Sequence, residues 1–96
     1  MATKVPPSAF HAIVHGMVQG VGFRYWARGA AAGLRLTGWV RNLNDGTVEI
    51  YCEGAKESLD DFARLLQAGP PGARVERVDL HARTPQGTYN RFSIIV

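Results

Sequence analysis

The stretch FHAIVHGMVQGVGFRYWARGAAAGL, residues 10–34, contains a strand, a loop and a helix in succession. Its first residues alternate, with Phe10, Ala12 and Val14 on one face, which predicts a strand with one buried side. Closely spaced glycines then end the strand. Apolar residues recur at helical spacing over Phe23–Leu34, which predicts an amphipathic helix directly after the glycine loop.

The rest of the chain continues this alternation of strands and helices. Two strand-like runs, Leu36–Asn42 and Thr47–Glu53, flank an Asn-Asp-Gly turn and predict a β-hairpin. A second helix is expected over Lys56–Gln67, a strand over Val75–Arg83 and a last short strand over Phe92–Val96. The order β-α-β-β-α-β predicts an α+β, ferredoxin-like sandwich. We expect an antiparallel sheet with both helices on one face, plus the short C-terminal strand.

Alternation within the third and fourth strands predicts how their side chains divide between the two faces of the sheet. The residues that share one face are Val48, Ile50 and Cys52 on the third strand and Val78, Leu80 and Ala82, expected inward, on the fourth. The other face of the third strand carries Glu49, Tyr51 and Glu53. Cys52 is expected to fill core space.

Size and composition limit the class of protein. The 96 residues allow one domain, expected over residues 9–96 after a flexible tail of residues 1–8. The net charge of +3 is scattered, which favours an anionic small molecule over nucleic acid as partner. Cys52 is the one cysteine, so no internal disulfide forms. No apolar run reaches the ~20 residues of a membrane span, and the tail lacks a signal peptide's apolar stretch. We therefore expect a cytoplasmic protein with no membrane or nucleic-acid partner. A monomer is expected as well, although neither charge nor composition determines the oligomeric state.

The segment GMVQGVGFR, from Gly16 to Arg24, combines three features that favour an anion. Its glycines let successive backbone N–H groups turn inward together, which makes an anion-binding nest. The segment leads into a helix N-terminus, whose free N–H groups and dipole attract negative charge. Arg24 adds a planar fork for two phosphate oxygens. The segment matches neither common nucleotide-binding glycine motif, and a simple tight turn is the alternative explanation of its glycines.

Asn42 closes the second predicted strand, just before the hairpin turn. Its carboxamide is both donor and acceptor, so it can orient a water without titrating. Asparagine is also common in turns, which leaves a purely structural role open. Arg41 falls on the opposite face and is expected to be solvated, whereas Asp45 is expected to serve the turn.

The sequence offers no metal site and calls for no cofactor. His11 and His15 lie on one strand, about 13 Å apart at ~3.3 Å per residue, so they cannot share an ion. His15 is expected to be a structural residue, although its place before the glycine loop makes it the first candidate for a protein nucleophile.

Two segments carry a specific resemblance to a known family. Residues 16–24 match Gly-x-Val-Gln-Gly-Val-x-Phe-Arg, and residues 38–49 match Gly-x-Val-x-Asn-x-x-Asp-Gly-x-Val-Glu, both without gaps. Together they resemble the two signature motifs of the acylphosphatase family, and Phe62, Gly69-Pro70-Pro71 and residues 75–78 add agreement. The chain departs at its C-terminus, which ends Phe-Ser-Ile-Ile-Val where family members commonly end Phe-x-Ile-Arg-Tyr.

The resemblance implies the ferredoxin-like fold and a hydrolase that cleaves the carboxyl–phosphate anhydride of acyl phosphates. It implies that Arg24 binds the phosphate and that Asn42 positions the attacking water. It also implies phosphate-binding backbone N–H groups from Gln19, Gly20, Val21, Gly22 and Phe23. Metal and cofactor are not implied, and inorganic phosphate is expected as a product inhibitor.

A non-catalytic binding module of the same fold is the rival class, either RNA-binding or regulatory. RNA-recognition domains share this order of elements and use exposed aromatic residues on the central strands, a role open to Tyr51. The neighbouring Glu49 and Glu53 would repel a phosphate backbone, and intact Arg24 and Asn42 argue against a silent regulatory domain.

Overall fold

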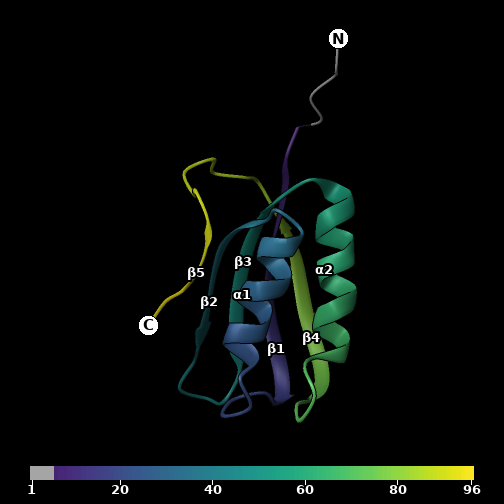
Figure 1. Ribbon diagram of the computed structural model, residues 1–96, viewed down its shortest axis with the longest axis vertical. Helices are drawn as coiled ribbons and strands as arrows, with labels where there is room; N and C mark the ends of the chain where they lie inside the picture. The colour runs from purple at the N-terminus through teal and green to yellow at the C-terminus, as the bar shows by residue number, and fades with distance from the viewer. Residues whose placement is uncertain (1–5) are drawn as a thin grey trace.

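A computed structural model describes residues 6–96 of the protein (Figure 1). The elements, in chain order, are β1 (Ser8–Met17), α1 (Phe23–Gly33), β2 (Thr37–Asn42), β3 (Val48–Gly54), α2 (Lys56–Ala68), β4 (Arg74–Arg83) and β5 (Phe92–Ile94). Every element expected from the sequence is present in the expected order. Of the predicted tail, residues 1–5 lie outside the described residues, and residue 8 already belongs to β1.

The five strands form one sheet in the order β4-β1-β3-β2-β5, with α1 and α2 side by side on one of its faces (Figure 1). The first four strands pair antiparallel, which confirms the ferredoxin-like sandwich. β5 pairs parallel with β2, so the complete sheet is mixed rather than antiparallel. Within residues 6–96, no helix is long and apolar enough to cross a membrane.

The direction of β5 follows from the path of the chain. β4 lies at one edge of the sheet and β5 at the other, and the connection between them passes one end of the sandwich (Figure 1). The chain therefore enters β5 from the end at which it leaves β4, and β5 runs opposite to β4. β2 runs in the same direction as β5, so the two strands pair in parallel.

The core lies between the sheet and the two helices. Among the strand residues predicted to share the inner face, those at most 4% exposed are Phe10, Ala12, Val14, Val48, Ile50 and Cys52. The helices contribute residues at helical spacing, which are Phe23, Ala27 and Ala31 from α1 and Leu59, Phe62 and Leu66 from α2. The ring of Phe62 stacks on Phe10 at 6.3 Å between centroids and meets Phe92 edge-on at 5.8 Å. These contacts fix α2 across the sheet.

β4 departs from the expected burial. Leu80 pairs with Ala12 and Ala82 with Phe10, so both point toward the helix side as predicted. Leu80 is nevertheless 40% exposed, and Ala82 is exposed as well. A hollow of about 430 Å³ opens here between β4 and the first turns of α2. The two side chains point inward without being buried, because α2 does not close over this end of the edge strand.

The face of the sheet opposite the helices is partly covered by the connection that follows β4. Tyr89 of this connection lies 5.5 Å from the ring of Tyr51 and meets the indole N–H of Trp39 through its hydroxyl. Tyr51 is only 6% exposed as a result. Glu53 accepts hydrogen bonds from the Tyr51 hydroxyl at 2.5 Å and from the backbone N–H of Gln86 at 2.6 Å. Burial, helped by Glu53, raises the pKa of Tyr51 to about 12. Tyr51 is therefore not available as an exposed aromatic for stacking bases.

Candidate active site

The glycine loop begins where β1 changes register. The pairing of β1 with β4 shifts between His15 and Gly16. Gly16 has a φ of +129°, and a β-carbon there would lie 2.1 Å from the carbonyl oxygen of Arg74. No other residue type fits so close to the backbone of β4. The pairing of β1 with β4 continues after this register shift as far as Met17. Val18, which is 1% exposed, then anchors the start of the loop in the core.

The loop presents unpaired backbone donors. Gly20 and Gly22 have φ values of +76° and +75°, which lie in the left-handed region that favours glycine. Gly22 is the N-cap of α1, and no acidic residue lies in the first helical turn. Among the hydrogen bonds within residues 6–96, none uses the N–H of Gly20, Val21 or Gly22. These groups and the first N–H groups of α1 can bind an anion.

Gln19 has a structural contact that the sequence did not predict for its side chain. Its Nε2 donates to the carbonyl oxygen of Leu43 at 2.8 Å and to that of Thr47 at 2.9 Å. These carbonyls stand at the two ends of the β2–β3 turn. The side chain therefore ties the glycine loop to the hairpin that carries Asn42. The backbone of Gln19 stays available to the loop.

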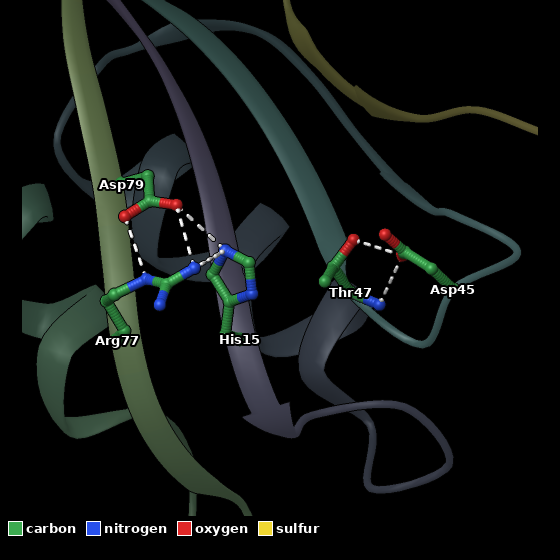
Figure 2. Close-up of polar contacts among 5 residues, drawn as sticks. All are labelled: His15, Asp45, Thr47, Arg77 and Asp79. Atoms are coloured by element: carbon green, nitrogen blue, oxygen red, sulfur yellow. Dashed lines mark hydrogen bonds and ion pairs between the residues drawn. The ribbon is translucent and has the colours of Figure 1, made fainter.

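The hairpin turn is braced by its own side chains (Figure 2). Oδ1 of Asp45 accepts hydrogen bonds from the backbone N–H of Thr47 at 3.0 Å and from the Thr47 hydroxyl at 2.6 Å. These bonds lower the pKa of Asp45 below its usual value. The prediction that Asp45 serves the turn is confirmed. The turn holds a fixed shape next to the last residue of β2.

Asn42 has an unusual environment. It is the last residue of β2 and pairs with Val48. Among the buried side-chain polar atoms of residues 6–96, Oδ1 of Asn42 alone lacks a hydrogen-bond partner. Such an acceptor costs about 1–3 kcal/mol if it stays unsatisfied. A buried acceptor of this kind requires a donor from outside the protein's own groups, such as a water O–H.

Arg24 and Arg41 differ in their partners. Arg24 lies in the first turn of α1, is partly exposed and has no ion pair with an Asp or Glu among the described residues. Arg41 instead donates from Nε to Glu49 at 2.5 Å and lies 5.4 Å from the ring of Trp39. Arg41 is thus paired with Glu49 on the face of the sheet opposite the helices, which we call the open face. It is not simply solvated, as was expected. α1 begins and β2 ends at the same end of the sandwich, so Arg24 and Asn42 belong to one end of the molecule (Figure 1).

His15 is engaged in a polar network on the open face (Figure 2). Its Nε2 lies 2.9 Å from Oδ2 of Asp79 and 3.1 Å from Nη2 of Arg77. The hydrogen bond from His15 and then the contacts with Arg77 hold the pKa of Asp79 below its usual value. His15 therefore has the structural contacts expected of it. In residues 6–96, no group of three or more His, Cys, Asp or Glu side chains is placed to hold a metal ion.

The fold and the loop define a class, that of ferredoxin-like sandwiches with a glycine loop before the first helix. The family model described as Acylphosphatase matches residues 10–94. An acylphosphatase from Trichormus variabilis is 49% identical over 77 residues, 80% of this chain and 76% of that protein. One from Bacillus licheniformis is 45% identical over 85 residues, 88% of this chain and 94% of that protein. The crystal structure of acylphosphatase from Bacillus subtilis matches with a TM-score of 0.89 and 37% identity, over 93% of this chain and 99% of that one.

The chain belongs to the acylphosphatase family. It is an acylphosphatase enzyme, a hydrolase that cleaves acyl phosphates, and acyl phosphate is the substrate that the family implies. The resemblance stated from the two sequence motifs is confirmed.

Proposed function

We propose that Arg24 and the backbone N–H groups of residues 19–23 hold the phosphoryl group while Asn42 positions the water that attacks phosphorus. The observation that carries this proposal is the unpartnered, buried Oδ1 of Asn42, which can accept a hydrogen bond from that water. The free fork of Arg24 and the free N–H groups of the loop supply donors for the phosphate oxygens. No Asp or Glu side chain is paired with Arg24 in residues 6–96, so its positive charge is available to a dianion.

The chemistry asks little of the protein beyond position and charge. The water oxygen forms a bond to phosphorus as the bond from phosphorus to the acyl oxygen breaks. The electron pair of the broken bond leaves on the carboxylate, which is stable without protonation. The proton of the water passes to an oxygen of the substrate's own phosphoryl group. Arg24 and the loop meet the charge on the equatorial oxygens, and Asn42 aligns the nucleophile.

The rival assignment as an RNA-binding module has no support in the geometry. The aromatic side chain that it required, Tyr51, is 6% exposed beneath Tyr89. The expected monomeric state and cytoplasmic location stay predictions, as does inhibition by the product, inorganic phosphate.

Asn42→Ala tests the assignment of the water. Removal of one well-placed polar group from such a site lowers turnover by about 10²–10³, or ~2.7–4 kcal/mol. We expect a loss of that size in kcat for benzoyl phosphate, with the inhibition constant of inorganic phosphate changed only a few-fold. Asn44→Ala is the matched control, since Asn44 is an exposed residue of the same turn. If phosphate affinity collapses while kcat holds, Asn42 binds the phosphoryl group instead of the water.

A further inference from the structure

A second basic region lies at the far end of α1 from the glycine loop. A hollow of about 520 Å³ opens between the second half of α1, the start of β2 and the segment before β5. The residues of the hollow that bear on its chemistry are Arg28, Gly29, Ala32, Arg35, Asn90 and Arg91. Neither Arg24, Asn42 nor any residue of the glycine loop lines this hollow. The hollow is therefore separate from the proposed phosphoryl site.

The hollow gathers positive charge without a counter-charge. Arg28, Arg35 and Arg91 reach it from two segments far apart in the sequence, and none of its lining residues is Asp or Glu. None of the three arginines takes part in an ion pair within residues 6–96. Arg28 lies over the ring of Tyr25, 5.1 Å from its centroid, which restrains its guanidinium. Three like charges around one concavity repel one another, and an anion between them removes that repulsion.

The backbone of Arg35 adds an independent argument. Its φ of +58° makes it the only non-glycine residue with a positive φ among residues 6–96. The backbone N–H of Leu36 bonds to the carbonyl of Ala31 at 2.9 Å, the reverse turn that ends a helix with a left-handed residue. Glycine is the usual residue at that position because a β-carbon is crowded there. The chain instead keeps an arginine in a strained conformation at the rim of the hollow.

The floor of the hollow is open to a ligand. Gly29 lies inside α1, where glycine is unfavourable relative to alanine. A β-carbon at Gly29 would meet no atom within 4 Å, so packing against a neighbour does not require glycine there. Because Gly29 has no side chain, it leaves space in the hollow that the three arginines also line. The carboxamide of Asn90 offers a further donor at the edge.

We propose that this hollow is a second anion site, one that binds a small molecule carrying two linked phosphoryl groups. Three guanidinium forks can each address a pair of oxygens. A single phosphate would have to share its four oxygens among three forks, whereas inorganic diphosphate has six terminal oxygens, one pair for each fork. The proposal is independent of the roles of Arg24 and Asn42, since it concerns a different end of α1.

The test is a titration of the ¹⁵N-labelled protein with inorganic pyrophosphate, followed by the backbone amide signals. Gly29 and Asn90 report on the hollow, while Gly20 and Gly22 report on the glycine loop. We expect saturable shifts of the Gly29 and Asn90 signals in the wild-type protein. In the double variant Arg35→Gln/Arg91→Gln, the dissociation constant from these signals should rise at least about tenfold. The control Arg64→Gln/Arg83→Gln removes the same charge elsewhere and should leave it within about twofold.

Arg35→Gly separates the function of this residue from its effect on stability. It removes the side chain and relieves the positive φ, so the unfolding midpoint should equal or exceed that of the wild type while the pyrophosphate response of Gly29 weakens. Three results would overturn the proposal. They are shifts confined to Gly20 and Gly22, equal weakening in the double variant and its control, or binding of inorganic phosphate at the hollow as tight as that of pyrophosphate.

Discussion

The glycine-loop end of the molecule and the open face of its sheet are both rich in polar groups, but those groups differ in whether they have partners. On the open face, Glu49 accepts from His11 at 2.7 Å and from Arg41 at 2.5 Å. At the loop end, Arg24 has no acidic partner among the described residues and Oδ1 of Asn42 has no donor. The paired groups stabilise the fold, while the free groups carry an energetic cost that a bound substrate can offset.

The energetic cost of the unpartnered groups at the loop end is small compared with the total stability of a folded domain. One unsatisfied buried acceptor costs about 1–3 kcal/mol, and total stabilities of small domains are ~5–15 kcal/mol. Glu53 shows the opposite case, since its carboxylate accepts from the Tyr51 hydroxyl and from the N–H groups of Gln86 and Gly87. Changes at the two regions should therefore separate activity from stability.

The largest expected effect is that of Arg24→Lys on activity. Lysine keeps the charge but cannot present two parallel N–H donors to a phosphoryl group. We expect kcat/KM for benzoyl phosphate to fall by at least about 10³, with weaker inhibition by inorganic phosphate and an unchanged unfolding midpoint. Arg64→Lys, the same exchange on the exposed side of α2, is the control and should keep wild-type kinetics. Wild-type turnover in Arg24→Lys would contradict the claim that the glycine-loop end serves activity while the open face of the sheet serves stability.

Glu53→Gln should show the reverse pattern. The substitution keeps the shape of the side chain but removes the charge that three donors share, so we expect the free energy of unfolding to fall by about 1–3 kcal/mol. kcat should stay within about twofold of wild type, because Glu53 lies away from the glycine loop. Urea unfolding followed by fluorescence measures the free energy of unfolding, with Glu76→Gln, at an exposed residue of β4, as control. A large loss of activity with unchanged stability would contradict the comparison.

A smaller effect is expected from pH. Burial alone would raise the pKa values of Glu49 and Glu53, but hydrogen bonds from His11 and Arg41, and from Tyr51 and two backbone N–H groups, hold both below the usual 4.5. A pKa that is lower in the folded state means that the ionised carboxylate stabilises the fold. This contribution is present above pH 4.5 and is lost as the pH falls through the folded-state values.

The unfolding free energy of the wild type should therefore decrease as the pH falls below 4.5. The double variant Glu49→Gln/Glu53→Gln should decrease less, because it has lost the two titrating groups. Parallel urea titrations at neutral and acidic pH measure the difference. Identical pH dependence in the two proteins would show that these carboxylates do not contribute to acid unfolding.

Local patterns predicted much of this architecture. Alternation placed Phe10, Val14 and Ile50 in the core, and the turn chemistry of Asp45 was evident from its neighbours. The same patterns could not show how strands far apart in the sequence are ordered. The exposure of Leu80 depends on β4 being an edge strand, and the parallel β5 depends on the path between the two edges.

In the candidate site, too, some features could be predicted from the sequence and others depend on contacts between distant segments. Arg24 stood out because an arginine follows a glycine loop at a helix N-terminus, whereas Asn42 received its predicted role from the resemblance of residues 38–49 to a family motif. The tie from Gln19 to the carbonyls of Leu43 and Thr47 could not be predicted, because it joins a side chain to backbone atoms of a distant turn. The burial of Tyr51 likewise depends on Tyr89, which is 38 positions further along the chain. Contacts of this kind become visible only when the chain has folded.

The central claim is that the loop end holds phosphorus as the atom that water attacks. A single turnover of benzoyl phosphate in ¹⁸O-labelled water, with EDTA present, tests it most directly. The account predicts that the label appears in inorganic phosphate and that none appears in benzoate, because we propose that Arg24 and the loop bind the phosphoryl group and leave the acyl carbon without a stabilising contact. Label in benzoate would mean attack at carbon, and it would contradict the roles proposed for Arg24 and Asn42.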